Sequence, residues 1–307
     1  MHVDQHASRT PVADEPATES FIGLPFLWLE LTEKCNLRCV HCYTDSSPER
    51  PLHGVMSRKD WESALEQARD LGCAQVQFIG GEASLHPELP NLIDRAGAAG
   101  FTFIELFSNG VFFSKALRRS LVENDVHLAV SYYSSNKSTH DAVTLVKGSH
   151  ERTERTIAWA RAQNLHVRAN VVGTPLNVED ADRAIARLHE LGVRATQTTR
   201  VLGAGRGIPL VSGRSMRDRL CGYCWRGSLC VTAAGNVYPC PVERELQVGS
   251  FEQSLAAIVA KEELLRFRRR VRDFFAQPDV SPDGCTTPCT CTCTCTCVAP
   301  CTCTCVR

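Results

Sequence analysis

The chain has 307 residues, of which 43% are hydrophobic, and its 34 basic side chains balance 34 acidic ones. This length is enough for one α/β domain of about 200 to 250 residues and a smaller module beside it. Because a net charge of zero provides no field that would attract a phosphate backbone or an anionic lipid surface, we expect no nucleic acid and no membrane partner, and instead a small molecule or a peptide.

The first twenty residues form a polar segment without the apolar stretch of a signal peptide. No run of about 18 apolar residues occurs elsewhere in the chain, so the sequence predicts no membrane span. We therefore predict a disordered N-terminus at residues 1–20 and a cytoplasmic protein. Because thiols are kept reduced in the cytosol, the 17 cysteines are expected to be metal ligands rather than disulfides.

Residues 21–202 alternate short β-rich runs with amphipathic helical patterns. The six predicted strands cover residues 26–31, 75–79, 101–107, 127–133, 166–172 and 194–201. The five helices predicted between them cover residues 57–71, 87–99, 114–123, 149–164 and 177–191. Strands that alternate with helices pair in parallel through right-handed crossovers, so the sequence predicts an α/β fold with an open or partial barrel of six β/α units.

The composition changes after residue 202. A glycine-rich linker is predicted over 203–220, and a small cysteine-rich module with a long helix over 250–275 is predicted for 221–284. Pro278 and Pro282 end that helix. Residues 285–307 form a tail of Cys and Thr without apolar periodicity, which cannot build a core of its own.

Three cysteines follow the first predicted strand directly, at Cys35, Cys39 and Cys42, with the spacing C-x3-C-x2-C. Thiolates are suitable ligands for zinc or for iron–sulfur centres. Three thiolates can hold three irons of a [4Fe-4S] cluster and leave the fourth iron without a protein ligand. An open coordination position indicates chemistry, because structural sites are closed. The alternatives are a zinc site or thiols that are there incidentally.

This cysteine loop resembles the radical S-adenosylmethionine (SAM) superfamily, and the resemblance extends over about residues 24–201. It implies that the chain binds a [4Fe-4S] cluster and SAM. Gly80, Gly81 and Glu82 end the second predicted strand, where members of this superfamily hold the methionine amino group of SAM. Ala83 departs from the usual pattern, which has Pro at this position.

The resemblance implies further contacts with SAM. Ser108 and Asn109 at the end of the third strand, and Ser131 at the end of the fourth, resemble the family's ribose and carboxylate contacts. Lys147 stands where many relatives carry Arg, so it is a candidate partner of the SAM carboxylate, without the bidentate geometry of Arg. His41 occupies the position of an aromatic ring near the adenine and is not predicted to be a metal ligand.

A second cysteine group contains Cys221, Cys224, Cys230 and Cys240, with a turn predicted at residues 234–236 between two short strands. On the residues alone a zinc ribbon is an alternative. The spacing Cys224-x10-Gly235-x4-Cys240 resembles the SPASM extension, which implies one or two auxiliary iron–sulfur clusters.

The tail contributes further candidate ligands, with more thiols than two clusters need. We expect that the repeat has expanded and that only a few of these cysteines bind metal, rather than all of them. A third possibility is adventitious binding of zinc or copper by this segment. The candidate ligands in the tail are Cys285, Cys289, Cys291, Cys297 and Cys301.

The resemblance implies a radical SAM oxidoreductase. Such an enzyme cleaves SAM reductively to a 5′-deoxyadenosyl radical that abstracts a substrate hydrogen, with the auxiliary clusters accepting an electron. The predicted substrate is a ribosomal peptide or a related natural-product intermediate, and a reducing partner such as flavodoxin or ferredoxin is implied. Because the N-terminus is too short for a leader-peptide-binding domain, a separate peptide-binding protein is a possible partner. One alternative is dehydrogenation or epimerisation of a small sugar or aminocyclitol, and another is a non-catalytic iron–sulfur or metal-binding protein.

Overall fold

The computed structural model describes residues 23–213 and 215–276; the predictions for residues 1–20 and 285–307 lie outside these described residues. The six predicted strands are all present. They are β1 (Phe26–Glu30), β2 (Gln75–Ile79), β3 (Phe103–Ser108), β4 (His127–Tyr132), β5 (Val167–Gly173) and β6 (Ala195–Arg200). The helices between them are α1 (Arg58–Asp70), α2 (Leu89–Ala98), α3 (Lys115–Glu123), α4 (Lys137–Thr144), α5 (Ser149–Ala162) and α6 (Ala181–Glu190).

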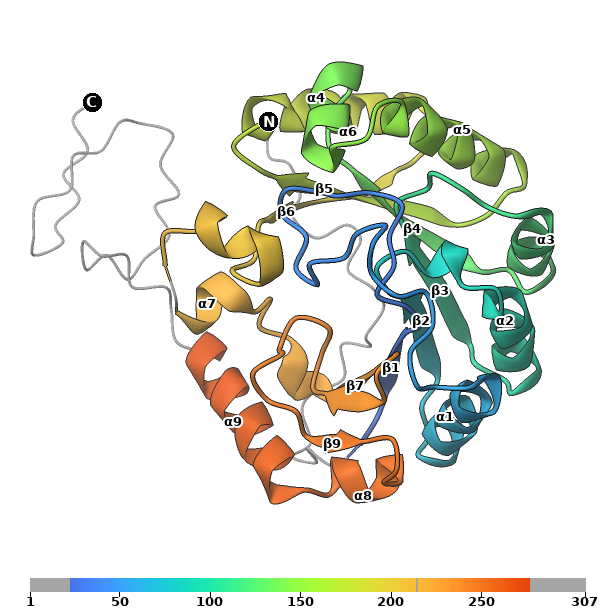
Figure 1. Cartoon of the computed structure of the whole chain (residues 1–307), viewed down its shortest axis with the longest axis vertical. Coiled ribbons are helices and arrows are strands. Elements are labelled where there is room, and N and C mark those ends of the chain that lie inside the picture. The colour runs from blue at the N-terminus through green and yellow to red at the C-terminus, as the bar shows by residue number, and fades with distance from the viewer. Residues whose placement is uncertain (1–22, 214, 277–307) are drawn as a thin grey trace, which may run out of the picture.

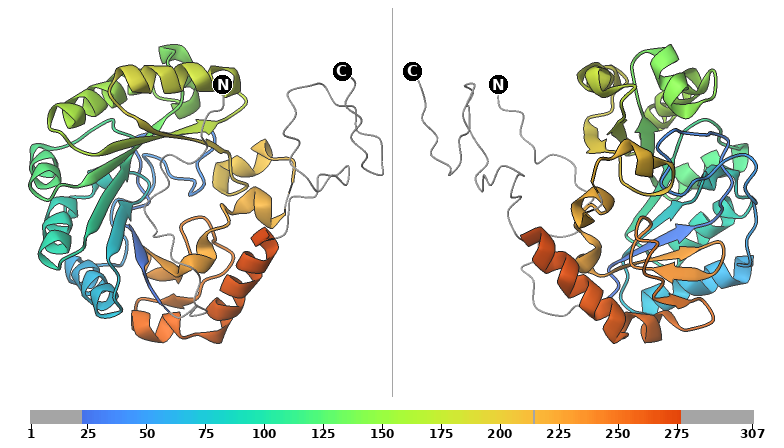
Figure 2. Two further views of the ribbon diagram at one scale, coloured as in Figure 1. Left: turned by 180° about the vertical axis from the view of Figure 1, so that it is seen from behind. Right: turned by 60° about the vertical axis from the view of Figure 1, so that its left-hand side comes forward.

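The strands form one open, curved sheet in the order β6-β5-β4-β3-β2-β1-β7-β8-β9. From β1 to β6 every neighbouring pair is parallel, and the helices lie along the outer side of the curve (Figures 1 and 2). The predicted α/β partial barrel is therefore confirmed. Since parallel strands place their carboxyl ends at one edge, the loops that follow β1 to β4 meet there.

The two faces of the sheet differ in chemistry. On β1, Leu27 and Leu29 are buried in the core against the helices, whereas Trp28 between them faces the inner side. The Trp28 indole Nε1 donates to Gln77 Oε1 at 2.7 Å, and the Gln77 amide donates to Glu105. The Arg168 guanidinium completes this polar row with two hydrogen bonds of 2.7 Å to the Glu105 carboxylate.

The start of α1 follows from its local sequence. The Ser57 hydroxyl accepts a hydrogen bond from the Asp60 backbone N–H, and the Asp60 carboxylate accepts one from the Ser57 N–H, which forms a capping box.

Replacement of Ser57 by Ala is expected to lower the free energy of unfolding by about 1 kcal/mol. Urea unfolding of the apoprotein checks this, with exposed Lys59→Ala as a control expected to leave stability unchanged.

The structure adds elements that the sequence analysis did not predict. Helix α4 lies in the connection between β4 and α5. Two short helices lie inside the predicted linker, the 3-10 helix η3 (Gly205–Leu210) and α7 (Met216–Arg219). The predicted hairpin is present as β7 (Ser228–Thr232) and β8 (Asn236–Tyr238), followed by β9 (Gly249–Ser250). Strand β7 also pairs in parallel with β1, so β7, β8 and β9 extend the sheet that β1 to β6 form.

The single helix predicted over 250–275 is wrong, because the structure has two helices, α8 (Leu255–Val259) and α9 (Glu262–Ala276). Both helices bury apolar residues in the same core, but against different elements. Helix α8 contacts α1, whereas α9 contacts the 3-10 helix η4 (Cys224–Arg226). The chain turns between the two helices, where Lys261 Nζ donates to the Val248 carbonyl at 2.7 Å.

Candidate metal centre

The loop with the first three cysteines is held by backbone hydrogen bonds on two sides. On one side Gly81 N–H donates to Thr32 O at 2.7 Å and Glu82 N–H donates to Lys34 O at 2.8 Å. On the other side, residues 38 and 40 donate to carbonyls at the end of α4, each at 3.0 Å. The ligand-bearing loop is thus anchored between the end of β2 and α4.

Gly80 and Gly81 allow the close approach of this loop to the end of β2. A Cβ added at either residue would lie closer than 3.0 Å to a backbone carbonyl oxygen, that of Thr32 for Gly80 and those of Glu33 and Lys34 for Gly81. No side chain fits there without a shift of the backbone. The two glycines selected from the sequence are therefore needed for the close contact between the end of β2 and the cysteine loop.

The buried Glu82 side chain connects the end of β2 to the end of β3. It accepts hydrogen bonds from the Ser108 hydroxyl at 2.7 Å, the Asn109 N–H at 2.7 Å and the Ser84 N–H at 3.1 Å. Burial raises the pKa of Glu82, although these hydrogen bonds oppose the shift. A carboxylate has about four acceptor positions, so one remains for a further donor.

The residue after Glu82 begins the 3-10 helix η1 (Ala83–Leu85), and Glu82 itself has an extended backbone with φ −138° and ψ 104°. An extended residue is compatible with a following Pro, which is well tolerated at the first position of a helix. Ala83 therefore occupies the position that Pro takes in the family without changing the turn.

Asn109 connects Glu82 to the first cysteine, Cys35. Its amide Nδ2 donates to Asn36 Oδ1 at 2.8 Å and lies 3.7 Å from Cys35 Sγ. The Cys35 sulfur also accepts from the Leu37 N–H at 3.4 Å. The structure thereby brings together four residues from three separate segments that the sequence analysis selected: Cys35, Glu82, Ser108 and Asn109.

Cys39 lies beside the end of β4. Its sulfur is 3.8 Å from the Tyr133 hydroxyl, which is also hydrogen-bonded to Ser131. The His41 ring meets the Tyr133 ring edge-on, with 5.1 Å between centroids. Tyr133 thus contacts three residues that were selected from the sequence, Cys39, Ser131 and His41. Tyr133 itself was not selected, although its position directly after a strand end could have indicated a role in the site.

The residues around this loop fit the cluster and SAM that the sequence implies. His41 Nδ1 is buried and has no hydrogen-bond partner among the described residues, and burial lowers the pKa of His41 to about 4, so the ring is neutral. Burial also raises the pKa of Cys39 to about 12, so this thiol becomes a thiolate only when a metal binds it. The unpartnered His41 Nδ1 is therefore the atom here that a bound group could satisfy.

Within residues 23–213 and 215–276, no three His, Cys, Asp or Glu side chains converge closely enough to bind one metal ion. An iron–sulfur cluster binds each thiolate to a different iron and does not need such convergence.

Lys147 lies in the short connection between α4 and α5. Its side chain is exposed, and its carbonyl accepts a hydrogen bond from Arg152 at 3.1 Å. The nearby Asp141 carboxylate accepts from the N–H groups of Gly148 and His150 and so caps α5.

The second cysteine group gathers at the start of β7. Cys224 and Cys240 are buried, with 3.1 Å between their sulfurs, and Cys221 hydrogen-bonds to Cys224. Cys230 is fully buried on β7, within electrostatic range of Cys240. Cys221, Cys224 and Cys240 are thus linked by direct contacts, and Cys230 lies on the adjoining strand. The five tail cysteines selected from the sequence, Cys285, Cys289, Cys291, Cys297 and Cys301, lie outside the described residues.

An ion pair on the inner side of the sheet lies between the two cysteine groups. Glu30 at the end of β1 is bound by Arg244, which follows β8. Tyr43, the residue after Cys42, lies within electrostatic range of Glu30, Arg244 and Cys230. This pair could not be predicted from the sequence, because its members are 214 positions apart and no local pattern relates them.

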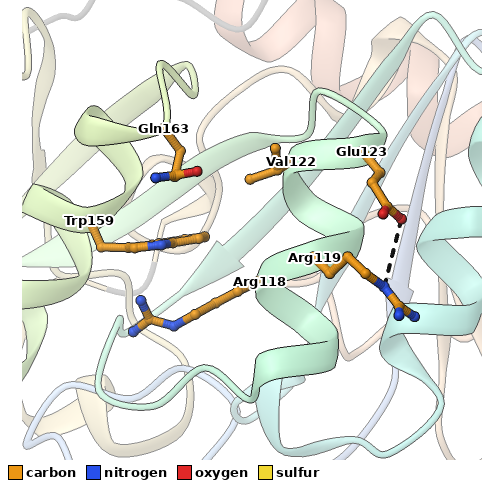
Figure 3. Close-up of a pocket in the computed structure, with 6 residues that line it drawn as sticks. All are labelled: Arg118, Arg119, Val122, Glu123, Trp159 and Gln163. Carbon is orange, nitrogen blue, oxygen red and sulfur yellow. Dashed lines mark ion pairs between the residues drawn. The ribbon is translucent and has the colours of Figure 1, made fainter.

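A pocket of about 310 Å³ lies elsewhere, on the outer side of the sheet between α3 and α5 (Figure 3). The Arg118 guanidinium stacks on the Trp159 ring there, 4.4 Å from its centroid. None of the selected residues lines this pocket.

Comparisons with known proteins agree with this arrangement. The sequence model described as radical SAM superfamily matches residues 29–188, and the SPASM model, described as iron-sulfur cluster-binding domain, matches residues 221–290. In the part of the chain that the structure describes, no helix has the length and apolar character needed to cross a membrane.

Two curated relatives are similar over most of the chain. The antilisterial bacteriocin subtilosin biosynthesis protein AlbA of Bacillus subtilis (strain 168) is 25% identical over 263 residues, covering 75% of this chain and 58% of that protein. A PqqA peptide cyclase of Ruegeria pomeroyi (strain ATCC 700808 / DSM 15171 / DSS-3) is 29% identical over 189 residues, covering 60% of this chain and 49% of that protein. The chain therefore spans about half the length of these relatives.

Among solved structures, Streptococcus suis SuiB bound to S-adenosylmethionine matches with a TM-score of 0.64 and 15% identity, covering 85% of this chain and 70% of that one. At this identity the likeness shows a shared fold.

Proposed function

Because the chain belongs to the radical SAM superfamily, we propose that it cleaves SAM reductively and uses the resulting radical to abstract a hydrogen atom from a ribosomal peptide. Members of this superfamily use a [4Fe-4S] cluster and SAM, and a SPASM segment implies auxiliary iron–sulfur clusters. When bound, the first cluster supplies the electron that breaks the C5′–S bond of SAM. The protein's own residues bind, orient and shield the reactants.

The observation that carries this proposal is the meeting of Cys35, Glu82 and Asn109, which come from the loops after three different strands. In our proposal Cys35, Cys39 and Cys42 bind three irons and leave the fourth for SAM. The remaining acceptor position of Glu82 is suited to the methionine ammonium group.

For the rest of SAM we propose contacts from residues at the ends of β3 and β4. His41, whose ring is neutral and whose Nδ1 has no hydrogen-bond partner among the described residues, is proposed to lie against the adenine. The other proposed contacts are Gly80, Gly81, Ser108, Asn109, Ser131 and Lys147.

A peptide substrate is supported by the relatives named above, one in the biosynthesis of a bacteriocin and one a peptide cyclase. We propose that residues 21–202 form the SAM-cleaving core and 221–284 the auxiliary module, joined by the linker 203–220. Thiols among Cys221, Cys224, Cys230 and Cys240 are proposed to hold an auxiliary cluster that accepts an electron from the substrate radical, which would make the net reaction an oxidation. The electron for SAM would come from a flavodoxin or ferredoxin.

Deletion of the cysteine-rich tail tests whether the tail provides ligands to a cluster. We expect the anaerobically reconstituted protein to hold more than four irons per chain, and the iron content to fall when residues 285–307 are deleted. Iron and sulfide analysis of both proteins, with equal SAM cleavage as the control for an intact core, measures this. Unchanged iron after the deletion would contradict a ligand role for the tail.

The substrate class has its own test. The reconstituted enzyme is incubated with SAM, dithionite and a short precursor peptide encoded near its gene, and mass spectrometry measures a loss of two hydrogens from the peptide. Turnover of a sugar or aminocyclitol, without any change in the peptide, would favour the alternative.

A further inference from the structure

The cysteine loop is held on a third side by Arg206, a residue more than 160 positions away in the sequence. Arg206 lies in η3, on the segment that leaves β6. Its guanidinium donates to Cys39 O at 2.9 Å and to Ser46 O at 2.8 Å, and it forms an ion pair of 2.6 Å with Asp45. Its backbone N–H donates to Cys42 O at 2.9 Å. One residue thus binds four points of the loop and the turn after it.

The chain around Arg206 is shaped for this contact. Gly205 has φ +52°, and a Cβ there would lie closer than 3.0 Å to the carbonyl oxygens of Cys42 and Tyr43. Gly207 on the other side of Arg206 has a similar restriction, because a Cβ would meet Leu202 O at less than 3.0 Å. The segment therefore lies directly on the cysteine loop, at a distance that only glycine allows.

Arg206 also places a positive charge beside the loop. The side chain is 27% exposed, whereas its partner Asp45 is 49% exposed, so water screens the carboxylate more than the guanidinium. This charge lies next to two of the three cysteines, because the guanidinium donates to Cys39 O and the Arg206 backbone N–H donates to Cys42 O, each at 2.9 Å. The potential of an iron–sulfur cluster depends on net charge, hydrogen bonds and exposure.

We propose that Arg206 is a positioning residue for the iron–sulfur cluster: its planar fork fixes the carbonyl of Cys39 and the turn after Cys42, and its charge raises the reduction potential of the cluster. This inference rests on the proposed function, because it requires a cluster on the loop. It adds to that function a residue from the linker, which matches neither family segment.

The test compares Arg206→Met, Arg206→Lys and the matched control Arg50→Met. Arg50 forms an ion pair of 2.6 Å with the same carboxylate, Asp45, and makes no contact with Cys39. Two quantities are measured on full-length, anaerobically reconstituted protein: the midpoint potential of the cluster signal that changes on addition of SAM, by electron paramagnetic resonance, and the rate of iron loss to a chelator.

We expect Arg206→Met to lower the midpoint potential and to speed iron loss on the order of tenfold, since it removes hydrogen bonds to a charged group. Arg206→Lys keeps the positive charge but loses the planar guanidinium that makes several hydrogen bonds at once. The midpoint potential of its cluster should therefore equal that of the wild type, while its iron loss is faster. Arg50→Met should match the wild type in both measurements.

A wild-type potential in Arg206→Met would overturn the inference, as would an equal shift in Arg50→Met. If Arg206→Met fails to take up iron, Arg206→Lys decides, and a lowered potential in that variant overturns the electrostatic role. Absence of a SAM-sensitive cluster signal from wild-type protein would instead contradict the proposed function itself, so the two failures are distinguishable.

Discussion

Replacement of Cys39 by Ala should abolish the formation of 5′-deoxyadenosine from SAM. Cys39 is one of only three thiols on the loop after β1, so its loss leaves two protein ligands for the first cluster. Mutation of outer residues of a metal site costs about 10- to 100-fold in affinity or activity, so removal of a ligand should cost more than about 100-fold. The measurement is chromatographic detection of 5′-deoxyadenosine after anaerobic incubation with SAM and dithionite.

The matched control is Cys73→Ala, the same chemical change at a thiol away from the loop. Cys73 is fully buried at the end of α1 and donates to Gln75 O at 3.2 Å. We expect the Cys73 variant to retain SAM cleavage with a modest loss of stability. If the Cys39 variant still produced 5′-deoxyadenosine at the wild-type rate, the cluster could not be bound by this loop. A wild-type protein that held iron but never cleaved SAM would favour the electron-carrying alternative.

Local patterns in the sequence were sufficient for most of the fold. Strand β2 has the predicted bounds, and the other five strands of the barrel differ by one or two residues at one or both ends. Gly72, Gly100 and Gly192 follow their helices with φ between +78° and +80°, as expected of helix C-caps. Helix α4 was missed because only three of its residues, His140, Val143 and Thr144, are buried, and two of these are polar. Such a segment has no apolar stripe to detect.

The features that could not be predicted depend on contacts between segments far apart in the sequence. The cysteine loop and Gly80 to Glu82 were predictable because each is a short motif with a local chemical meaning. The parallel pairing of β7 with β1 was not, since a hairpin pattern specifies its own two strands and says nothing about a third. Arg206 and the Glu30–Arg244 pair were also missed, because their partners lie 160 or more positions away.

Gly81→Ala is expected to displace the cysteine loop and prevent cluster assembly. The added Cβ would meet the carbonyl oxygens of Glu33 and Lys34 at less than 3.0 Å, and both are backbone atoms that cannot rotate away. Lys34 directly precedes Cys35, so the movement is transmitted to the first ligand. Overpacking of this kind costs about 1 to 3 kcal/mol of stability. Iron content after reconstitution and urea unfolding of the apoprotein measure the two effects.

Gly173→Ala provides the control, because Gly173 also stands at the carboxyl end of a barrel strand. A Cβ there would make an ordinary contact of 3.7 Å with Thr199 O, so we expect normal iron uptake and unchanged or slightly higher stability. Full iron uptake by Gly81→Ala would show that the loop tolerates a displaced Lys34 carbonyl. The requirement for glycine would then come from the space that SAM itself needs, which a rise in the SAM concentration required for half-maximal cleavage would reveal.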